Sequence, residues 1–354
     1  MRLSARLKLY FLGIMKQDQK SGTIFDKILK IVLLIISKIY EFLLNLINFF
    51  YMCHVFSAAK AAIPVISVGN IVLGGTGKTP FTVYLAGILL KDNKHPSVLM
   101  RGYGDDEYKI TREKLKSVNV FVGKDRVKSS KEALIAGADA VILDDGFQYR
   151  RLRRDLNIVL IDAKAPFGNG YLFPRGILRE PKTTLNRAHI VVITRADRIG
   201  ETARAILVND IKRYAPDASI VTSAHKAECF VNCSGEIFPV NILKNKKIYA
   251  LSGIAEPDYF VEMIVRLSGC IIFRADYPDH YDYSQNDIDF ICEKAVSADI
   301  DFIVTTEKDY VKIQEFDLKN IARKFLVLRI NLSVLEGEEK IRAGLNSLFF
   351  CNSH

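Results

Sequence analysis

The sequence predicts an α/β fold built on a parallel β-sheet, and three observations support this. Short apolar runs alternate with segments of helical pattern, a glycine-rich loop follows the first run, and an apolar basic segment precedes it. Strands buried on both faces are typical of parallel sheets. Five runs lie at 65–68, 97–100, 140–143, 157–161 and 190–193. A second series lies at 248–251, 302–305 and 325–330, which indicates a second, smaller α/β region.

Length and composition set the broad class of protein. With 354 residues, 49% hydrophobic and 25% charged, the chain is long enough for two domains and too apolar to be disordered. Its 21 glycines and 10 prolines exclude collagen-like proteins. The six cysteines are scattered, and Cys229 and Cys233 lack the partner spacing of a zinc site, so free thiols are expected. The net charge of +10 favours a polyanionic partner.

The first 60 residues form a basic and apolar segment. They contain nine Lys or Arg residues and three acidic ones, and so hold +6 of the net charge. Lys30, Lys38 and Glu41 interrupt the apolar part, whose longest charge-free run is the 12 residues 42–53. A spanning helix needs about 20 apolar residues. The pattern therefore favours a helix lying in the interface of an anionic membrane, and the alternative is a core helix of the soluble fold.

The pattern divides the chain into four parts. Residues 1–60 are the membrane-associated helical segment, 61–225 the larger α/β domain, 226–246 a β linker and 247–354 the smaller α/β domain. Within the linker, 229–238 is expected to form a hairpin with a Ser-Gly turn.

The loop after the first strand carries the strongest functional signal. Backbone N–H groups of such loops surround phosphate oxygens, and the following helix directs its positive N-terminus at the same place. We expect Lys78 on the β- and γ-phosphates and the Thr79 hydroxyl on Mg²⁺, as in P-loop proteins. Val72 stands where the usual pattern begins with glycine. The residues expected to bind the nucleotide are Val72, Leu73, Gly74, Gly75, Thr76, Gly77, Lys78 and Thr79.

Two aspartates, Asp144 and Asp145, end the strand at 140–143. Ligands of open parallel sheets bind at this edge, where a carboxylate can reach Mg²⁺ directly or through water. Adjacent side chains point in different directions, so the two carboxylates are expected to have different roles. A simple Asp-Asp-Gly turn is the alternative. At the end of another strand, Thr194–Asp197 is expected to be a salt-bridged strand exit.

Nine motifs follow one another between Pro64 and about Leu328. They are Val68–Pro80, Arg101–Gly104, Val122–Arg126, Asp144–Gln148, Phe167–Gly170, Pro174–Pro181, Leu251–Pro257, Pro278–Tyr281 and Thr305–Asp309. Their ordered set resembles that of the tetraacyldisaccharide 4′-kinases of lipid A biosynthesis. The resemblance implies transfer of the γ-phosphoryl group of ATP to the 4′-hydroxyl of a tetraacyldisaccharide 1-phosphate, with Mg²⁺ as cofactor. It also implies a location on the cytoplasmic face of the bacterial inner membrane.

The sequence departs from the family pattern at two places. Tyr149 stands where the family has a histidine after Asp-Asp-Gly-Phe-Gln. The family also has a Gly-Asp-Glu-Pro segment with an aspartate as catalytic base, and here Gly104-Asp-Asp-Glu-Tyr108 follows the Arg-Gly-Tyr-Gly motif at once. The distance to Asp144 makes Asp106 the better match, and Asp105 stays open. An acidic turn without a catalytic role is the alternative reading of this segment.

The resemblance assigns roles to further residues. A sugar hydroxyl needs a group that accepts its proton, and this role falls to Asp106 with His280 as its partner. Because His280 lies in the second domain, catalysis is expected to require domain closure. Glu180 is implied as another acidic metal ligand. Arg101, Arg150 and Arg151 are expected to bind the anionic end of the substrate, or to form a basic face near anionic lipid.

Two other functions compete with the lipid kinase. A membrane-bound P-loop ATPase or nucleotide switch that acts on a protein partner would show the same loop and acidic strand end, but gives no reason for Asp106 and His280 to matter together. Nucleic-acid binding is not expected, because the basic charge lies beside an apolar helix and no aromatic-basic reading motif accompanies it.

Overall fold

The computed structural model describes residues 13, 23–102, 105–279 and 281–350. By their internal contacts, the residues divide into two compact units. Unit 1 comprises 1–102, 115–224 and 334–354, and unit 2 comprises 103–114 and 225–333. The chain therefore passes between the units four times, and neither unit is one continuous segment.

Unit 1 contains the parallel sheet that the alternating pattern predicted. Its strand order is β7-β6-β5-β1-β4-β2-β3, and the neighbouring strands pair in parallel register. Because β1 lies between β4 and β5, the strand order reverses there, and the carboxyl end of β1 is the topological switch point. The strands are β1 (Val65–Gly69), β2 (Pro96–Met100), β3 (Asn119–Val122), β4 (Ala140–Asp144), β5 (Leu156–Asp162), β6 (Ile190–Thr194) and β7 (Ser219–Asn232).

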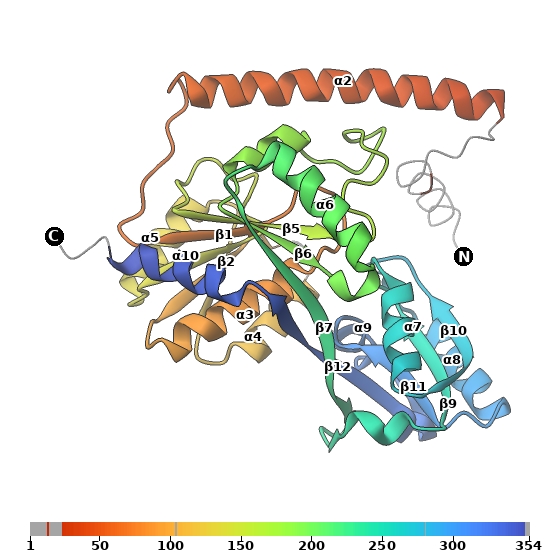
Figure 1. The fold of residues 1–354 in the computed structure, drawn as a ribbon. Helices are drawn as coiled ribbons and strands as arrows, with labels where there is room; N and C mark the ends of the chain where they lie inside the picture. Colours follow the sequence, from red (N-terminus) through yellow and green to blue (C-terminus); the bar gives the residue numbers. More distant parts are fainter. Residues whose placement is uncertain (1–12, 14–22, 103–104, 280, 351–354) are drawn as a thin grey trace. The chain divides into compact units, whose positions relative to one another are not determined.

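Helices cover both faces of this sheet (Figure 1). Leu207 and Ile211 of α6 pack in one core with Val159 and Val191 of the sheet. On the other face, Gly344 of α10 approaches the side chains of Leu156 and Ile190, which alternate with the first set along their strands. Besides α6 (Glu201–Tyr214) and α10 (Glu338–Phe350), the unit contains α3 (Lys78–Lys91), α5 (Arg126–Ile135), η1 (Lys182–Arg187) and η2 (Ala196–Arg198).

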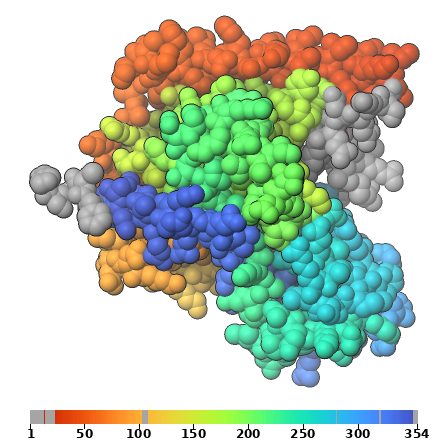
Figure 2. All heavy atoms as spheres, in the orientation of Figure 1, coloured from red at the N-terminus to blue at the C-terminus, as the bar shows by residue number. Residues whose placement is uncertain are grey.

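The N-terminal apolar segment forms one helix, α2 (Ile24–Met52), of 29 residues. Its start is fixed by a capping box in which Thr23 and Asp26 bond each other's backbone N–H. One stripe at helical spacing rests on unit 1: Leu33 and Ser37 are buried, and Tyr40 and Leu44 pack against the core beneath α6. The other faces expose large apolar side chains, and Figure 2 shows α2 along the outside of unit 1.

Unit 2 is a smaller parallel α/β layer with strand order β10-β9-β11-β12. Separate apolar clusters form on the two faces of its sheet. Its strands are β9 (Lys247–Ser252), β10 (Cys270–Asp276), β11 (Phe302–Thr306) and β12 (Phe325–Glu336). Its helices are α4 (Asp105–Lys114), η3 (Val240–Leu243), α7 (Pro257–Arg266), α8 (Gln285–Ser297), α9 (Glu307–Ile313) and η4 (Lys319–Lys324).

The predicted hairpin is present: β8 (Ile237–Phe238) pairs with the end of β7 in antiparallel register. The turn between them contains Gly235 at φ +82°, a conformation that favours glycine. Two segments differ from the expected organisation. The C-terminal helix α10 packs on the sheet of unit 1 rather than in the smaller domain, and Asp105–Lys114 is a helix of unit 2 rather than an acidic turn. Both differences depend on long-range packing, which local sequence pattern does not encode.

Candidate functional site

The glycine-rich loop joins β1 to α3 at the switch point of the unit 1 sheet. Gly74 and Gly77 have φ values of +113° and +86°, so side chains at these positions would be strained. Val72, at the position where the usual pattern has glycine, is 4% exposed and forms a β-bridge with Leu178. The Leu73 N–H donates to the Ile177 carbonyl at 2.7 Å. This departure from the pattern therefore anchors the loop to the segment 177–178.

Two polar residues hold the loop from inside. The Asn70 side-chain amide donates to the Thr76 hydroxyl at 2.9 Å. The Arg195 guanidinium donates to the Gly75 carbonyl at 2.5 Å and forms an ion pair with Asp162. The expected salt-bridged strand exit at 194–197 is thus present, and through Gly75 it also supports the phosphate loop.

The two aspartates at the end of β4 have different partners. The Thr79 hydroxyl donates to Asp144 Oδ2 at 2.9 Å. Asp145 Oδ1 lies 2.8 Å from Arg179 Nη1 and 3.6 Å from Lys78 Nζ. Burial alone would raise the pKa of Asp145, but Lys78 and Arg179 outweigh it and hold the pKa below 3.8. Asp145 is therefore a charged partner of the loop lysine, and Asp144 is the partner of the loop threonine.

A hydroxyl and a carboxylate 2.9 Å apart are the oxygen ligands that Mg²⁺ uses when nucleotide phosphates and water complete its shell. Thr79 and Asp144 fit this role. Within the described ranges no group of three His, Cys, Asp or Glu residues is arranged to hold a metal. Glu180 is 5% exposed and pairs with Arg187, whose guanidinium lies 4.3 Å from the centroid of the Phe147 ring. The structure therefore brings Lys78, Thr79, Asp144 and Asp145 together and engages Glu180 in an ion pair.

Sequence reasoning missed Arg126, the largest fully buried side chain of the described residues. Its guanidinium donates to the Asp144 carbonyl at 2.9 Å and to the Asp145 carbonyl at 3.1 Å. Asp145 is a non-glycine residue at φ +54°, so the clamp holds a strained turn. Burial lowers the pKa of Arg126, while Asp145 and Asp144 oppose that shift. The motif Val122–Arg126 contained the only signal, because nothing local shows what the arginine contacts.

Tyr149, the residue that departs from the family histidine, supports the same clamp. Its hydroxyl accepts a hydrogen bond from the Arg126 backbone N–H at 3.2 Å. Its ring lies 5.5 Å from the Arg126 guanidinium. At this position the side chain therefore packs against Arg126 at the start of α5.

The remaining predicted residues are dispersed. Arg101 and Arg151 are exposed, whereas Arg150 stacks 4.3 Å from the Tyr51 ring and bonds Asn48, which ties it to α2. Asp106 lies in the first turn of α4, and its side chain is outside the described part of the chain. His280 is also outside the described residues.

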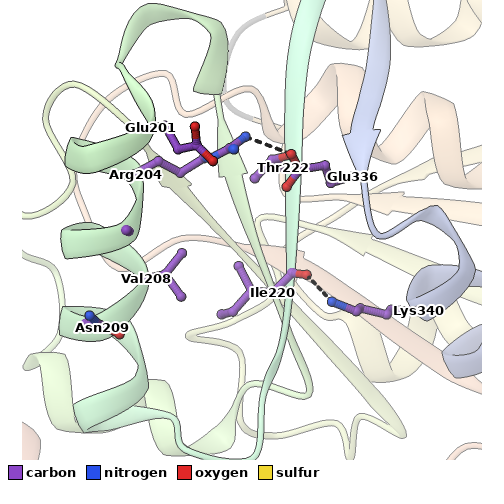
Figure 3. A pocket seen from close by; sticks show the side chains of 9 residues that line it. Glu201, Arg204, Val208, Asn209, Ile220, Thr222, Glu336 and Lys340 are labelled. Atoms are coloured by element: carbon purple, nitrogen blue, oxygen red, sulfur yellow. Dashed lines mark hydrogen bonds and ion pairs between the residues drawn. The ribbon is translucent and has the colours of Figure 1, made fainter.

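A separate cavity of about 350 Å³ lies between α6 and β7 (Figure 3). Its charged side chains are engaged: Arg204 pairs with Glu336 at 2.9 Å, and Lys340 Nζ donates to the Ile220 carbonyl at 3.1 Å. None of the loop residues or the two aspartates lines it, so we do not assign it to the phosphate site.

The parallel sheet, the glycine-rich loop at its switch point and the Thr79–Asp144 pair define a P-loop nucleotide-binding protein. A family model described as tetraacyldisaccharide-1-P 4′-kinase matches residues 29–114 and 104–349. The chain therefore belongs to the tetraacyldisaccharide 4′-kinase family, a family of ATP-dependent kinases of lipid A biosynthesis.

Individual relatives agree with this assignment. A tetraacyldisaccharide 4′-kinase of Desulfatibacillum aliphaticivorans is 36% identical over 324 residues, covering 81% of this chain and 84% of the relative. One from Halothermothrix orenii is 33% identical over 365 residues, covering 93% of each chain. The crystal structure of LpxK from Aquifex aeolicus in complex with ATP matches with a TM-score of 0.70 and 31% identity, covering 91% of this chain and 99% of that one.

Proposed function

We propose that this chain transfers the γ-phosphoryl group of ATP to the 4′-hydroxyl of a tetraacyldisaccharide 1-phosphate. The observation that carries the proposal is the convergence of Lys78, Thr79, Asp144 and Asp145 at the switch point of a chain that belongs to this kinase family. The family's motifs and its solved structure with ATP support the assignment.

The loop side of the reaction follows from the contacts. Lys78, held between the loop and Asp145, would neutralise the β- and γ-phosphates. Thr79 and Asp144 would hold Mg²⁺, which adds positive charge to the phosphates when bound. Arg126 keeps both aspartate carbonyls in place. Positioning and charge neutralisation supply most of the rate in phosphoryl transfer.

The acceptor side needs a base, because a sugar hydroxyl is a weak nucleophile near neutral pH. Asp106 would accept the hydroxyl proton, with His280 orienting the carboxylate or sharing the proton. The family resemblance supports these two assignments. Arg101 and Arg151, which are exposed, would contact the anionic end of the substrate, whereas Arg150 is engaged with α2.

The substrate would be taken from the cytoplasmic face of an anionic membrane, with α2 lying in the interface. By length and composition alone, α2 is long and apolar enough to cross a bilayer. Its contacts with unit 1, however, extend from Leu33 to Asn48, including Ser37 Oγ to the Leu172 carbonyl at 2.8 Å and Tyr40 OH to the Arg179 carbonyl at 3.0 Å. A helix held along its length by a polar domain fits an interfacial position rather than a transmembrane one.

The test is phosphoryl transfer from γ-labelled ATP to purified tetraacyldisaccharide 1-phosphate in detergent micelles, with wild type, Lys78→Ala and Asp106→Ala side by side. Labelled bis-phosphorylated lipid from wild type alone is the expected result. Transfer that survives in Asp106→Ala would keep the function and move the base, first to Asp105. A folded, ATP-binding wild type that transfers nothing would overturn the proposal and favour a membrane-bound ATPase.

A further inference from the structure

Helix α9 begins within the motif Thr305–Asp309, to which the proposed function gives no role. We propose that α9 is the common support of the two acceptor-side catalytic elements, α4 with Asp106 and the segment around position 280, and that Glu307 and Lys308 are positioning residues. The inference rests on the proposed function, because it takes Asp106 and His280 as the pair that activates the hydroxyl. All contacts that carry it lie within unit 2.

The first set of contacts joins α9 to α4, and the two helices pack together. Lys114 Nζ, at the end of α4, lies 2.6 Å from Glu307 Oε2, and both side chains are mostly buried, at 26% and 18% exposure. Arg329 of β12 lies 2.8 Å from Glu113 and 3.8 Å from Glu307. Partly buried, networked pairs of this kind constrain geometry more than isolated surface pairs do.

The second set joins α9 to the residues on either side of position 280. Lys308 Nζ lies 2.9 Å from Asp279 Oδ1, with both side chains less than one third exposed. One turn later, Lys312 Nζ donates to the Tyr281 carbonyl at 3.0 Å. Glu307 therefore contacts α4, while Lys308 and Lys312 contact the segment 279–281.

Asp309 fixes α9 itself to the sheet of unit 2. Its carboxylate is 2% exposed and accepts hydrogen bonds from the Thr306 hydroxyl at 2.6 Å, the Tyr283 hydroxyl at 2.9 Å and the Gly253 N–H at 3.0 Å. These contacts join the ends of β9 and β11 to the segment that follows position 280. The motif Thr305–Asp309 thus holds two elements at a fixed separation, and a displacement of about 1 Å at a reacting group can cost a hundredfold in rate.

The experiment uses the full chain and compares Lys308→Met with Lys109→Ala. Lys109 also joins α4 to the region of α9, but its pair with Glu315, at 3.6 Å, is 52% and 67% exposed and serves as the matched control. We expect Lys308→Met to lower kcat by about tenfold to a hundredfold, with the KM for ATP and the Tm unchanged. Lys308→Arg should restore part of kcat, and Lys109→Ala should behave as wild type.

A second comparison separates positioning from general damage. In an Asp106→Ala background, Lys308→Met should cause no further loss, because residues that act as a unit are not additive. The inference is overturned if Lys308→Met matches Lys109→Ala, if its loss adds fully to that of Asp106→Ala, or if it raises the KM for ATP instead. A wild type without transfer would instead count against the proposed function itself.

Discussion

At the residue scale, Asp144 and Asp145 show how adjacent carboxylates take different roles. The carboxylate of Asp144 faces the Thr79 hydroxyl, and that of Asp145 faces two cations. The strained backbone at Asp145, clamped by Arg126, is what turns the second side chain towards Lys78. Neither the spacing of the two aspartates nor their residue type distinguishes them in the sequence, because the difference comes from partners distant in the chain.

The two aspartates should therefore respond differently to substitution. Asp144→Asn should raise the Mg²⁺ concentration for half-maximal activity by about tenfold or more, since it removes a ligand oxygen charge. Asp145→Asn should lower kcat while leaving the Mg²⁺ requirement close to that of wild type, because it frees Lys78 from its partner. Initial rates at fixed ATP and varied MgCl₂ measure both effects. The reverse pattern would show that Asp145 is the metal ligand.

A single histidine gives a pH-dependent effect on stability. His189 Nδ1 accepts the Asn157 N–H at 2.9 Å, which requires the neutral ring. Burial and then Arg154 lower the pKa of His189 below 6.5, against the opposing effect of Asp155. A base with a lowered folded-state pKa stabilises the fold above its unfolded pKa, and this contribution is lost as the pH falls through the folded value.

Wild type should accordingly lose more Tm between neutral pH and about pH 5 than His189→Asn, whose amide oxygen can accept the same hydrogen bond without titrating. Thermal unfolding of both proteins across this pH range measures the difference. The carboxylates common to both proteins cancel in the comparison. Equal losses of Tm would show that His189 titrates alike in the folded and unfolded chains.

At the element scale, α2 shows what a charge count misses. The 12-residue charge-free run indicated a short apolar segment, but the helix has 29 residues because Lys38 and Glu41 pair on its surface at 2.8 Å. Its buried stripe contains Ser37 and Tyr40, polar residues that bond carbonyls of unit 1. Its exposed stripes contain the large apolar residues, so the more hydrophobic faces point away from the protein.

The exposed face should be the one that binds lipid. Ile35 and Ile39 are 56% and 57% exposed. Burying an isoleucine side chain contributes about 1.5–3 kcal/mol, so replacing both with glutamate should weaken binding to vesicles by a hundredfold or more, roughly. Vesicle flotation measures the binding, and Ile35→Leu with Ile39→Leu is the control that keeps the apolar area. Unchanged flotation of the glutamate variant would place the membrane contact elsewhere.

Most elements could be predicted from the sequence because their signals are local. The strands of both sheets, the phosphate loop and the hairpin at Gly235 were predicted within a few residues, since each has its own apolar run or turn residue. The helix at 105–114, the return of α10 to unit 1 and the Glu180–Arg187 pair could not be, because they depend on contacts between distant segments. The Arg126 clamp belongs to the same class.

At the scale of the whole molecule, the proposed roles separate by unit. The residues assigned to the phosphates, Lys78, Thr79, Asp144 and Asp145, belong to unit 1, and Asp106 and His280 belong to unit 2. The short segment 103–114 leaves unit 1 after β2 and returns before β3, so the proposed base belongs to a unit of which most follows residue 224. A domain boundary drawn from sequence order alone therefore assigns this residue to the wrong unit.

The charge of the whole chain makes a last prediction, about how it binds membranes. The first 60 residues hold +6 of the net +10 beside an apolar helix, so binding should have an electrostatic part and an apolar part. A basic residue near an anionic surface contributes about 1 kcal/mol, and raising ionic strength from about 0.1 M to about 1 M shortens the Debye length from roughly 10 Å to roughly 3 Å.

Binding to anionic vesicles should therefore fall steeply over this range, and binding to neutral vesicles should be weaker and nearly independent of salt. Co-sedimentation with the two kinds of vesicle measures both parts. The Ile35→Glu and Ile39→Glu protein should keep the salt-dependent part and lose the rest, because its lysines are intact while its apolar face is not. If salt left binding to anionic vesicles unchanged, the positive charge would have to serve the substrate phosphate or the fold rather than the membrane.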